Sequence, residues 1–299
     1  MIEQSRALDF DTTRASRAMD FVALTKPRVV VMVLVTTCVG FYLGTQGTTD
    51  YLHLLRTLLG TALAAGGTLA LNQFLERNVD AKMDRTRSRP LPDGRLQPAE
   101  SAIFGSVVTL AGLLYLTLAV SLLSGIVTAA TSVSYLFMYT PLKRKTPLCS
   151  IVGAVPGALP PVTGWVAAHQ GFGVEAWILF AILFLWQLPH SLAIAQLYRD
   201  DYARAGIRLL PIVEPDAKST GRQVVTNCSA LLVVGLLPTL VGLTGPAYFV
   251  AALVLGMAFL GYGIAFALAR TATAARQLLL ASLVYLPVLL IVMALDKVG

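Results

Sequence analysis

Residues 57 to 92 read TLLGTALAAGGTLALNQFLERNVDAKMDRTRSRPLP. The first part of this stretch, up to residue 71, is uncharged and apolar, as a segment within a lipid bilayer must be. Acidic and basic side chains then follow at once. Charges at a membrane boundary are costly unless they have partners or a function. The stretch therefore predicts a membrane helix whose charged end performs a specific task.

The composition of the whole chain agrees with a membrane protein. Of its 299 residues, 56% are hydrophobic and 13% are charged, whereas soluble domains carry about 25% charged residues. The net charge of +7 could indicate a nucleic-acid partner. The bases lie in short links between apolar runs, however, so we expect membrane topology and no nucleic acid. The three cysteines show no zinc-binding spacing and are interpreted as packing residues.

Uncharged runs predict nine membrane spans. These are 29–44, 57–75, two spans within 101–142 that break near 121–125, 151–168, 176–197, two spans within 223–269 that break near 243–246, and 277–295. Backbone groups in lipid must be hydrogen-bonded within their own segment, so each span should be a helix. The predicted fold class is all-α, a polytopic bundle. The Gly- and Pro-rich segment GAVPGALPPVTGW (153–165) predicts a kinked helix that packs closely against its neighbours.

The distribution of bases predicts how the chain is oriented. With the N-terminus inside, every lysine and arginine except Arg56 and Lys297 falls in an inner segment. We therefore expect a cytoplasmic N-terminus and a C-terminus outside. Residues 1–24 lack the apolar core of a signal peptide and should form a cytoplasmic tail. Residues 25–299 should form a single domain.

Polar side chains at the end of the second span share one helix face. Asn72, Glu76 and Asp80 are spaced by four residues and lie within about 80° of one another. Asp84 extends the row to about 120°. Oxygen-bearing side chains suit Mg²⁺, which typically joins one or two carboxylates to phosphate oxygens. The four residues are therefore the predicted metal ligands of this segment.

Arginines follow this acidic face directly. The guanidinium groups of Arg85, Arg87 and Arg89 match phosphate oxygens in bidentate geometry. Acidic residues, a metal and arginines in succession favour a diphosphate-binding site. The alternative is that these charges only set the membrane topology or pair on the surface, where an ion pair contributes little.

A second polar cluster follows the sixth span, on the same predicted side of the membrane. It contains Arg199, Asp200, Asp201, Arg204 and Arg208. Because both clusters end inner helices, they could face each other across one cavity. Metal ions bound by both acidic clusters could then surround one diphosphate and assist its departure as the leaving group.

Other inner polar residues have two interpretations each. His190 is either a structural hydrogen-bonding group of the sixth span or a functional group near the cavity. The basic link Lys143, Arg144 and Lys145 either sets the orientation or recognises an anion beside the same cavity.

Several motifs resemble those of the UbiA-type intramembrane prenyltransferases. NxxxExxxD followed by DRTRSRPLP resembles the first acidic motif of that family, and YRDDYARAGI resembles the second. TKPRVV, YTPLKRKTP, GAVPGALPPVTGW and LPHSLAIAQLYRDDYARAGIRLLP resemble, more narrowly, the haem-modifying branch. The resemblance covers about residues 20 to 295. Glu76 stands where aspartate is usual, and Ser191 and Tyr198 stand where quinone-pathway relatives have acidic residues.

The resemblance implies a nine-helix bundle around a central cavity that opens to the cytoplasmic side of a bacterial inner membrane. The implied reaction moves farnesyl from farnesyl diphosphate to a vinyl group of haem b, yielding haem O and diphosphate with Mg²⁺ as cofactor. Haem A synthase and terminal oxidase assembly factors are the implied protein partners. The competing interpretations are transfer to an aromatic quinone precursor, a membrane transporter, and a non-catalytic haem chaperone.

The resemblance also assigns roles to individual residues. The implied catalytic, metal-binding residues are Asn72, Glu76, Asp80, Asp200 and Asp201. The implied diphosphate-binding residues are Arg85, Arg89 and Lys143, the implied propionate-binding residues are Arg144 and Arg204, and His190 is expected at the haem iron or a propionate. Tyr198 is expected in the wall of the cavity, where aromatic rings stabilise a carbocation.

Overall fold

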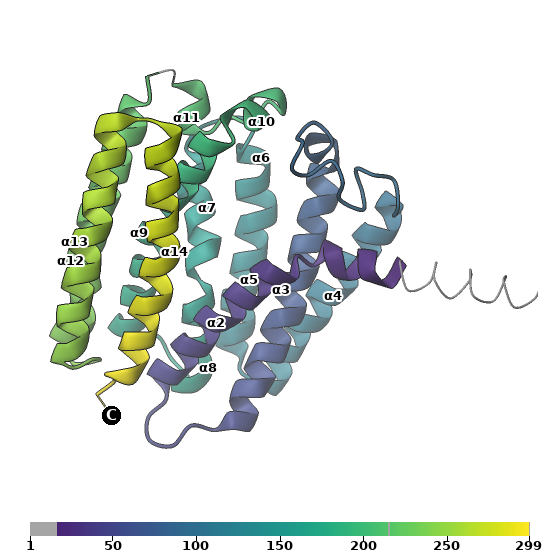
Figure 1. Ribbon diagram of the computed structural model, residues 1–299. Helices are drawn as coiled ribbons and strands as arrows, with labels where there is room; N and C mark the ends of the chain where they lie inside the picture. The colour runs from purple at the N-terminus through teal and green to yellow at the C-terminus, as the bar shows by residue number, and fades with distance from the viewer. Residues whose placement is uncertain (1–16, 215, 299) are drawn as a thin grey trace, which may run out of the picture.

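The computed structural model describes residues 17–214 and 216–298 as a bundle of helices (Figure 1). The helices are α2 (Pro27–Gly44), α3 (Tyr51–Asp80), α4 (Pro98–Ala119), α5 (Leu122–Val133), η1 (Ser134–Tyr139), α6 (Thr140–Leu142), α7 (Cys149–Ala158), α8 (Pro160–His169), α9 (Val174–Leu197), α10 (Arg199–Arg204), α11 (Leu210–Val213), α12 (Lys218–Leu240), α13 (Pro246–Ala269) and α14 (Ala272–Leu295). The described residues contain an isolated β-bridge but no strand, so the predicted all-α class is confirmed.

Nine helical segments of the described chain are long and apolar enough to cross a membrane, as predicted. Helices α5, η1 and α6 together form one span, and α7 and α8 form another. The chain turns at Ser121, whose hydroxyl caps α5 by accepting from the amide of Ser124. It turns again before Pro246, the first residue of α13. Both predicted breaks are therefore confirmed.

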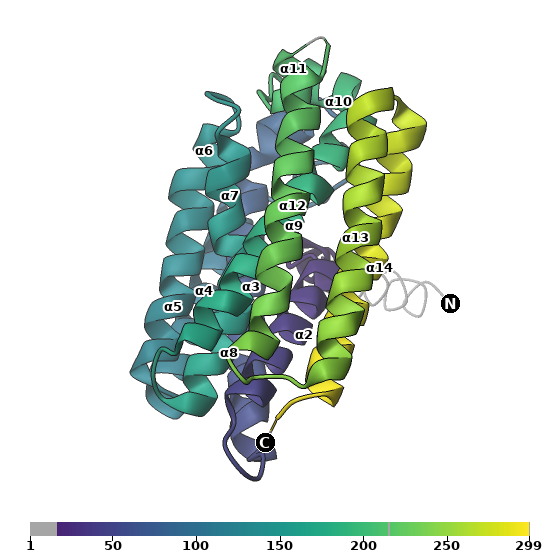
Figure 2. The same ribbon diagram turned by 90° about the vertical axis from the view of Figure 1, so that its left-hand side faces the viewer.

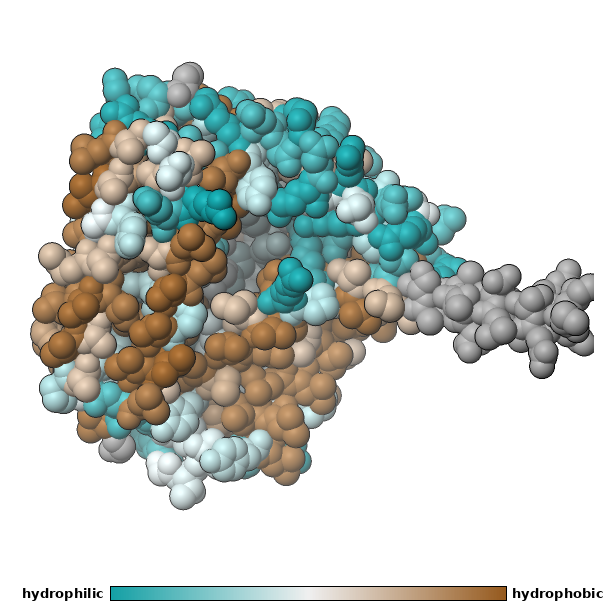
Figure 3. All heavy atoms as spheres, in the orientation of Figure 1, coloured by the Kyte–Doolittle hydropathy of each residue, from teal (hydrophilic) through white to brown (hydrophobic). Residues whose placement is uncertain are grey.

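Charged loops gather at one end of the bundle, which we call the charged end. The loops after α3, α6 and α9 all lie there, and the C-terminus lies at the opposite end (Figures 1 and 2). Hydrophilic residues cover the charged end, while apolar residues cover the flanks (Figure 3). Of the predicted N-terminal tail, residues 1–16 lie outside the described residues. Residues 17–24 are helical, and Leu24 is buried.

Helix α3 is longer than the span predicted at 57–75. It has 30 residues and reaches Asp80, so it extends about 45 Å. The helix continues through Glu76, a good helix former, whose carboxylate pairs with Lys143. The acidic face predicted from the spacing is therefore carried on a regular helix.

Close contact between α2 and α8 shapes one side of the bundle. The predicted kink occurs at Leu159, where α7 ends and α8 begins with Pro160. Gly40 of α2 packs against the backbone of Pro161, and Gly164 of α8 packs against the backbone of α2. Glycine allows this approach because it has no Cβ atom.

Candidate active site

Two adjoining cavities lie between the helices near the charged end. The deeper one, which we call the chamber, has a volume of about 410 Å³ and is bounded by α2, α3, α5, η1, α7, α8 and α9. The second, which we call the polar pocket, has a volume of about 250 Å³. Both are lined by Val29, Leu69, Arg85, Tyr135, Tyr139, Tyr202 and Leu209. The chamber and the polar pocket therefore adjoin each other across these seven residues.

The acidic face of α3 forms one wall of the polar pocket. Asn72 is fully buried, Asp80 is 2% exposed, and Glu76 is mostly buried. Asn72 donates to the hydroxyl of Thr140 at 3.1 Å. That hydroxyl donates to the carbonyl of Tyr135, within the π-helical turn η1. A π-helical turn often marks a functional site, and here it brings Thr140 against Asn72.

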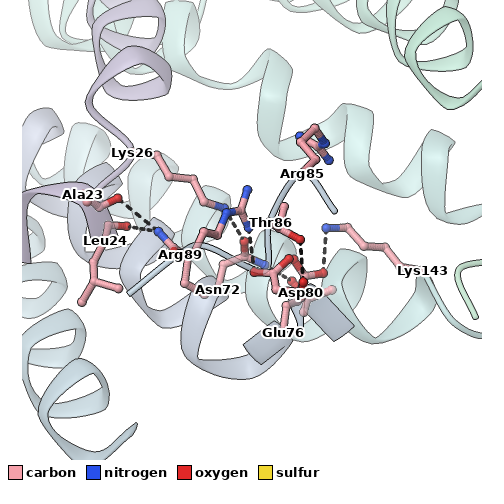
Figure 4. A network of polar contacts seen from close by, with 12 residues as sticks. Ala23, Leu24, Lys26, Asn72, Glu76, Asp80, Arg85, Thr86, Arg89 and Lys143 are labelled. Carbon is pink, nitrogen blue, oxygen red and sulfur yellow. Dashed lines mark hydrogen bonds and ion pairs between the residues drawn. The ribbon is translucent and has the colours of Figure 1, made fainter. Parts of the chain in front are cut away.

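Each of the three residues of this face has one cationic partner (Figure 4). Lys26 donates to Asn72 Oδ1 at 2.9 Å. Lys143 donates to Glu76 Oε1 at 2.7 Å, and Arg89 donates to Asp80 Oδ2 at 2.6 Å. The three cations come from three segments that are far apart in the sequence.

Positive charge exceeds negative charge in the polar pocket. Its lining includes four bases, counting Arg85, but only the carboxylates of Glu76 and Asp80. Burial, together with the charges of Arg89 and Lys143, lowers the pKa of Lys26 to about 7. An anionic ligand with several oxygens would relieve this repulsion and keep Lys26 protonated.

Arg85 connects the polar pocket to α10. Its guanidinium carbon lies 5.3 Å from the ring centre of Tyr198 and 5.9 Å from that of Tyr202. It also donates to the hydroxyl of Tyr202 at 3.3 Å. These contacts hold Arg85 at the boundary between the chamber and the polar pocket.

The second acidic cluster meets the first through Arg204. Its guanidinium pairs with Asp84 at 2.5 Å and also with Asp201. Asp84 is 61% exposed and lies outside both cavities, as does Asp201. The two clusters are therefore at the same end of the bundle, but these two carboxylates bind an arginine of the chain itself.

The remaining predicted residues lie at three different places. Asp200 and Arg144 are exposed at the charged end and line neither cavity. Tyr198 stacks on Arg85. His190 lies on α9 and accepts or donates a hydrogen bond with Ser282 of α14 at 2.7 Å.

Sequence reasoning gave no role to Lys26, Tyr135 or Thr140. Lys26 immediately precedes the first span and Pro27, which is the typical position of an orienting charge, so its sequence position did not distinguish it. The hydroxyl of Tyr135 lies 3.4 Å from Asn72 Oδ1. A tyrosine and a threonine in an uncharged span have no sequence signal that separates a site residue from a packing residue.

Threonines line the far end of the chamber. Thr61, Thr128 and Thr163 are the lining residues nearest the opposite end on α3, α5 and α8. The hydroxyls of Thr128 and Thr163 lie 3.3 Å apart. The buried hydroxyl of Thr61 has no hydrogen-bond partner in the described part of the chain. We call these three residues the floor of the chamber.

Asn72, Glu76 and Asp80 fit Mg²⁺ as a set of donors. The described residues hold no group of three His, Cys, Asp or Glu side chains that could form an all-protein metal site. Mg²⁺ does not require one, because it typically uses one or two carboxylates together with waters and substrate phosphates. Two carboxylates and an amide oxygen beside a basic pocket meet that requirement. The arrangement suits a ligand with an anionic, metal-binding head and an apolar tail.

Sequence comparison identifies the family. A profile of the UbiA prenyltransferase family matches residues 33–286, and the chain belongs to this family. The protoheme IX farnesyltransferase of Solibacter usitatus is 48% identical over 94% of this chain and 99% of its own length. That of Koribacter versatilis is 44% identical over 95% and 94%, respectively. The chain is thus a prenyltransferase with nine membrane-spanning helices in its described part.

Solved structures show the same fold. A digeranylgeranylglyceryl phosphate synthase superposes with a TM-score of 0.78 at 15% identity, over 94% of this chain and 98% of the other. A UbiA homologue from Archaeoglobus fulgidus bound to GPP and Mg²⁺ superposes with a TM-score of 0.61 at 15% identity, over 92% and 99%. Membership of a prenyltransferase family excludes the transporter interpretation.

Proposed function

We propose that this prenyltransferase transfers farnesyl from farnesyl diphosphate to a vinyl group of haem b. The allylic C–O bond breaks, a C–C bond forms to the vinyl group, and addition of water gives hydroxyethylfarnesyl haem and diphosphate. Relatives at 48% and 44% identity that carry the name protoheme IX farnesyltransferase support this assignment. The structural observation that carries it is a basic, carboxylate-bearing pocket that adjoins a largely apolar chamber with threonines at its far end.

The diphosphate would lie in the polar pocket. Arg85, Arg89, Lys143 and Lys26 would share its negative charge, which increases as the C–O bond breaks. Arg89 and Lys143 already approach the acidic face at 2.6 and 2.7 Å. Both side chains line the polar pocket, where the phosphate oxygens would lie.

Mg²⁺ would be held by Asn72, Glu76 and Asp80 together with the diphosphate. When bound, it neutralises charge on the leaving group. We propose a different role for Asp84 and Asp201: through Arg204 they position the loop that carries Arg85. Magnesium-bound structures of a homologue with GPP and DMAPP support the presence of the ion in this fold.

The farnesyl chain would lie in the chamber. Burial of each CH₂ group contributes about 0.8 kcal/mol, so transfer of the farnesyl tail into the apolar chamber is favourable. The rings of Tyr135 and Tyr139 line both cavities, where the carbocation would form. Aromatic faces stabilise positive charge, and the enclosing walls keep water from the cation.

The depth of the chamber fits a fifteen-carbon chain. Asn72 and Thr61 are eleven residues apart on α3, which places the floor about 16 Å below the polar pocket. An extended farnesyl chain is roughly 14 Å long, given C–C bonds of about 1.5 Å. The floor is therefore positioned to select chain length.

We further propose that the charged end faces the cytoplasm, in a bacterial inner membrane. Lysines and arginines concentrate in the loops of that end, as they do in cytoplasmic loops. Arg144 and Arg204 are exposed there, and we propose that they bind the haem propionates. Asp200, which is exposed, stays a predicted metal ligand that would require a rearrangement of α10.

The acceptor substrate distinguishes haem farnesylation from the nearest alternative, which is prenylation of an aromatic quinone precursor. Membranes containing the chain should convert farnesyl diphosphate and haem b to a farnesylated haem, and should not prenylate 4-hydroxybenzoate. Chromatography with mass spectrometry of extracted haems and phenols measures both products. Membranes without the chain provide the baseline. Prenylated hydroxybenzoate with unmodified haem would refute the proposal in favour of a quinone-pathway enzyme, and haem binding without turnover would favour a haem chaperone.

The floor gives a prediction about chain length. Replacing Thr163 with leucine should shorten the chamber because Thr163 is 2% exposed and faces Thr128. We expect kcat/KM for farnesyl diphosphate to fall about tenfold or more, since a misfit of one methylene in an apolar pocket has effects of that size. Transfer of the shorter geranyl group should change little. The near-isosteric Thr163→Val is the control, and an equal loss with both donors would contradict the assignment of the floor.

A further inference from the structure

His190 lies beside the wall of the chamber rather than in it. Its neighbours Gln187 and Ser191 line the chamber, and they are three residues before it and one residue after it on α9. At 100° per residue, His190 points about 60° to 100° away from those two side chains. Its side chain is half-buried and faces α14.

Hydrogen bonds determine which ring nitrogen of His190 carries the proton. Nδ1 lies 2.7 Å from the hydroxyl oxygen of Ser282. That hydroxyl donates to the carbonyl of Leu279 at 2.6 Å. A carbonyl oxygen can only accept, so the single hydroxyl hydrogen of Ser282 is used there. Nδ1 of His190 must therefore be the donor, and Nε2 of the neutral ring carries a lone pair.

Further contacts fix the plane of the ring. Trp186 stacks on His190 with ring centres 4.9 Å apart and an angle of 23° between the planes. The indole NH of Trp186 donates to the backbone carbonyl of Ser282 at 2.9 Å. Ser282 thus holds both rings of α9 against α14. Nε2 has no hydrogen-bond partner among the residues that the structure describes.

This is the arrangement of a histidine that binds a metal. Metal-binding histidines usually donate the proton of one ring nitrogen to a neighbouring group, which fixes the tautomer and the orientation of the other nitrogen. The face of the molecule that bears α14 and α2 is hollowed between these helices (Figure 3). Because His190 is only partly buried and does not line the chamber, a planar acceptor could approach it while the prenyl chain occupies the chamber.

We propose that Nε2 of His190 is the axial ligand of the haem iron, and that Ser282 and Trp186 hold the imidazole in position for it. This inference rests on the proposed function, because it identifies how that acceptor is held. The iron would lie beside α9, with an edge of the porphyrin directed toward the chamber wall formed by Gln187 and Ser191. The imidazole thus serves as a positioning group for the vinyl carbon.

Haem titration of the purified, full-length protein without farnesyl diphosphate tests this directly. Haem b should bind with the absorption spectrum of a histidine-ligated haem, and the ferrous form should show an iron–histidine stretch by resonance Raman spectroscopy. His190→Gly should lose both signals, and added imidazole should restore them. His169→Gly, at the opposite end of the bundle, is the matched control and should keep the wild-type spectrum.

Ser282→Ala provides a second readout that leaves the ligand in place. This variant lacks the hydroxyl that accepts the Nδ1 proton of His190. The tautomer and orientation of the imidazole are then no longer fixed, and haem affinity should fall roughly 10-fold or more. The proposal is overturned if wild-type protein binds haem b but His190→Gly retains its spectrum, or if imidazole fails to restore the signals in a folded His190→Gly protein. A wild-type protein that binds no haem b would instead refute the proposed function itself.

Discussion

Asp80→Asn is expected to reduce prenyl transfer roughly 100-fold or more. Asp80 is 2% exposed and is the most buried carboxylate of the acidic face. The substitution removes a charge that would hold Mg²⁺, and it leaves the guanidinium of Arg89 without its partner at 2.6 Å. Initial rates of transfer should be measured over a series of Mg²⁺ concentrations, with a chelator providing the zero point. We expect a lower maximal rate and a weaker apparent affinity for Mg²⁺.

Asp93→Asn is the matched control for this substitution. Asp93 lies in the same loop region, is 51% exposed and pairs with Arg95, so its loss should leave the rate nearly unchanged. Asp84→Asn should have a much smaller effect than Asp80→Asn because Asp84 lies outside the polar pocket. A near wild-type rate for Asp80→Asn, or full turnover in the presence of the chelator, would contradict a metal-bound diphosphate.

The contrast between Asp80 and Asp84 shows how far the sequence could predict the site. A period of four residues predicted Asn72, Glu76 and Asp80 on one face, and α3 presents them together. The same period extended the row to Asp84, but the helix ends at Asp80. The hydroxyl of Thr86 donates to the carbonyl of Asp80 at 2.8 Å and stabilises the turn. Asp84 then points outward, because helix ends depend on contacts that periodicity does not contain.

The cationic partners could not be paired from one sequence. Lys26 is 46 residues from Asn72, and Lys143 is 67 residues from Glu76. Each base is explained equally well as an orienting charge at the end of a span. Only the packing of α2 and α6 beside α3 brings them into one pocket. Long-range pairing of charges is therefore the part of the site that required the structure.

The fold was more predictable than the site because the bilayer imposes one strong requirement. Uncharged runs of span length must form helices, and this predicted all nine spans. Irregularities inside the spans were predicted only where proline marks them, as at Pro160. The π-helical turn η1 has no such mark in the sequence, although it precedes Thr140, which bonds to Asn72.

Gly164→Ala is expected to destabilise the protein more than any surface substitution. A Cβ atom at Gly164 would overlap the carbonyl oxygen of Thr37 and lie 2.7 Å from the amide nitrogen of Phe41. Both are backbone atoms of α2 and cannot rotate away, so α2 must move. Overpacking of this kind costs about 1–3 kcal/mol or more. Displacement of α2 would also shift Val29 and Val33 in the chamber wall, so transfer activity should fall as well.

Gly261→Ala separates this steric effect from the general effect of replacing a helical glycine. Gly261 lies within α13, and a Cβ atom there would meet no atom within 4 Å. Alanine favours a helix over glycine by about 1 kcal/mol, so this variant should melt at or above the wild-type temperature. Both midpoints should be measured by thermal denaturation in the same detergent. If Gly164→Ala melted with the wild type, the two helices would have room to separate, and the close α2–α8 contact would not determine where the chamber wall lies.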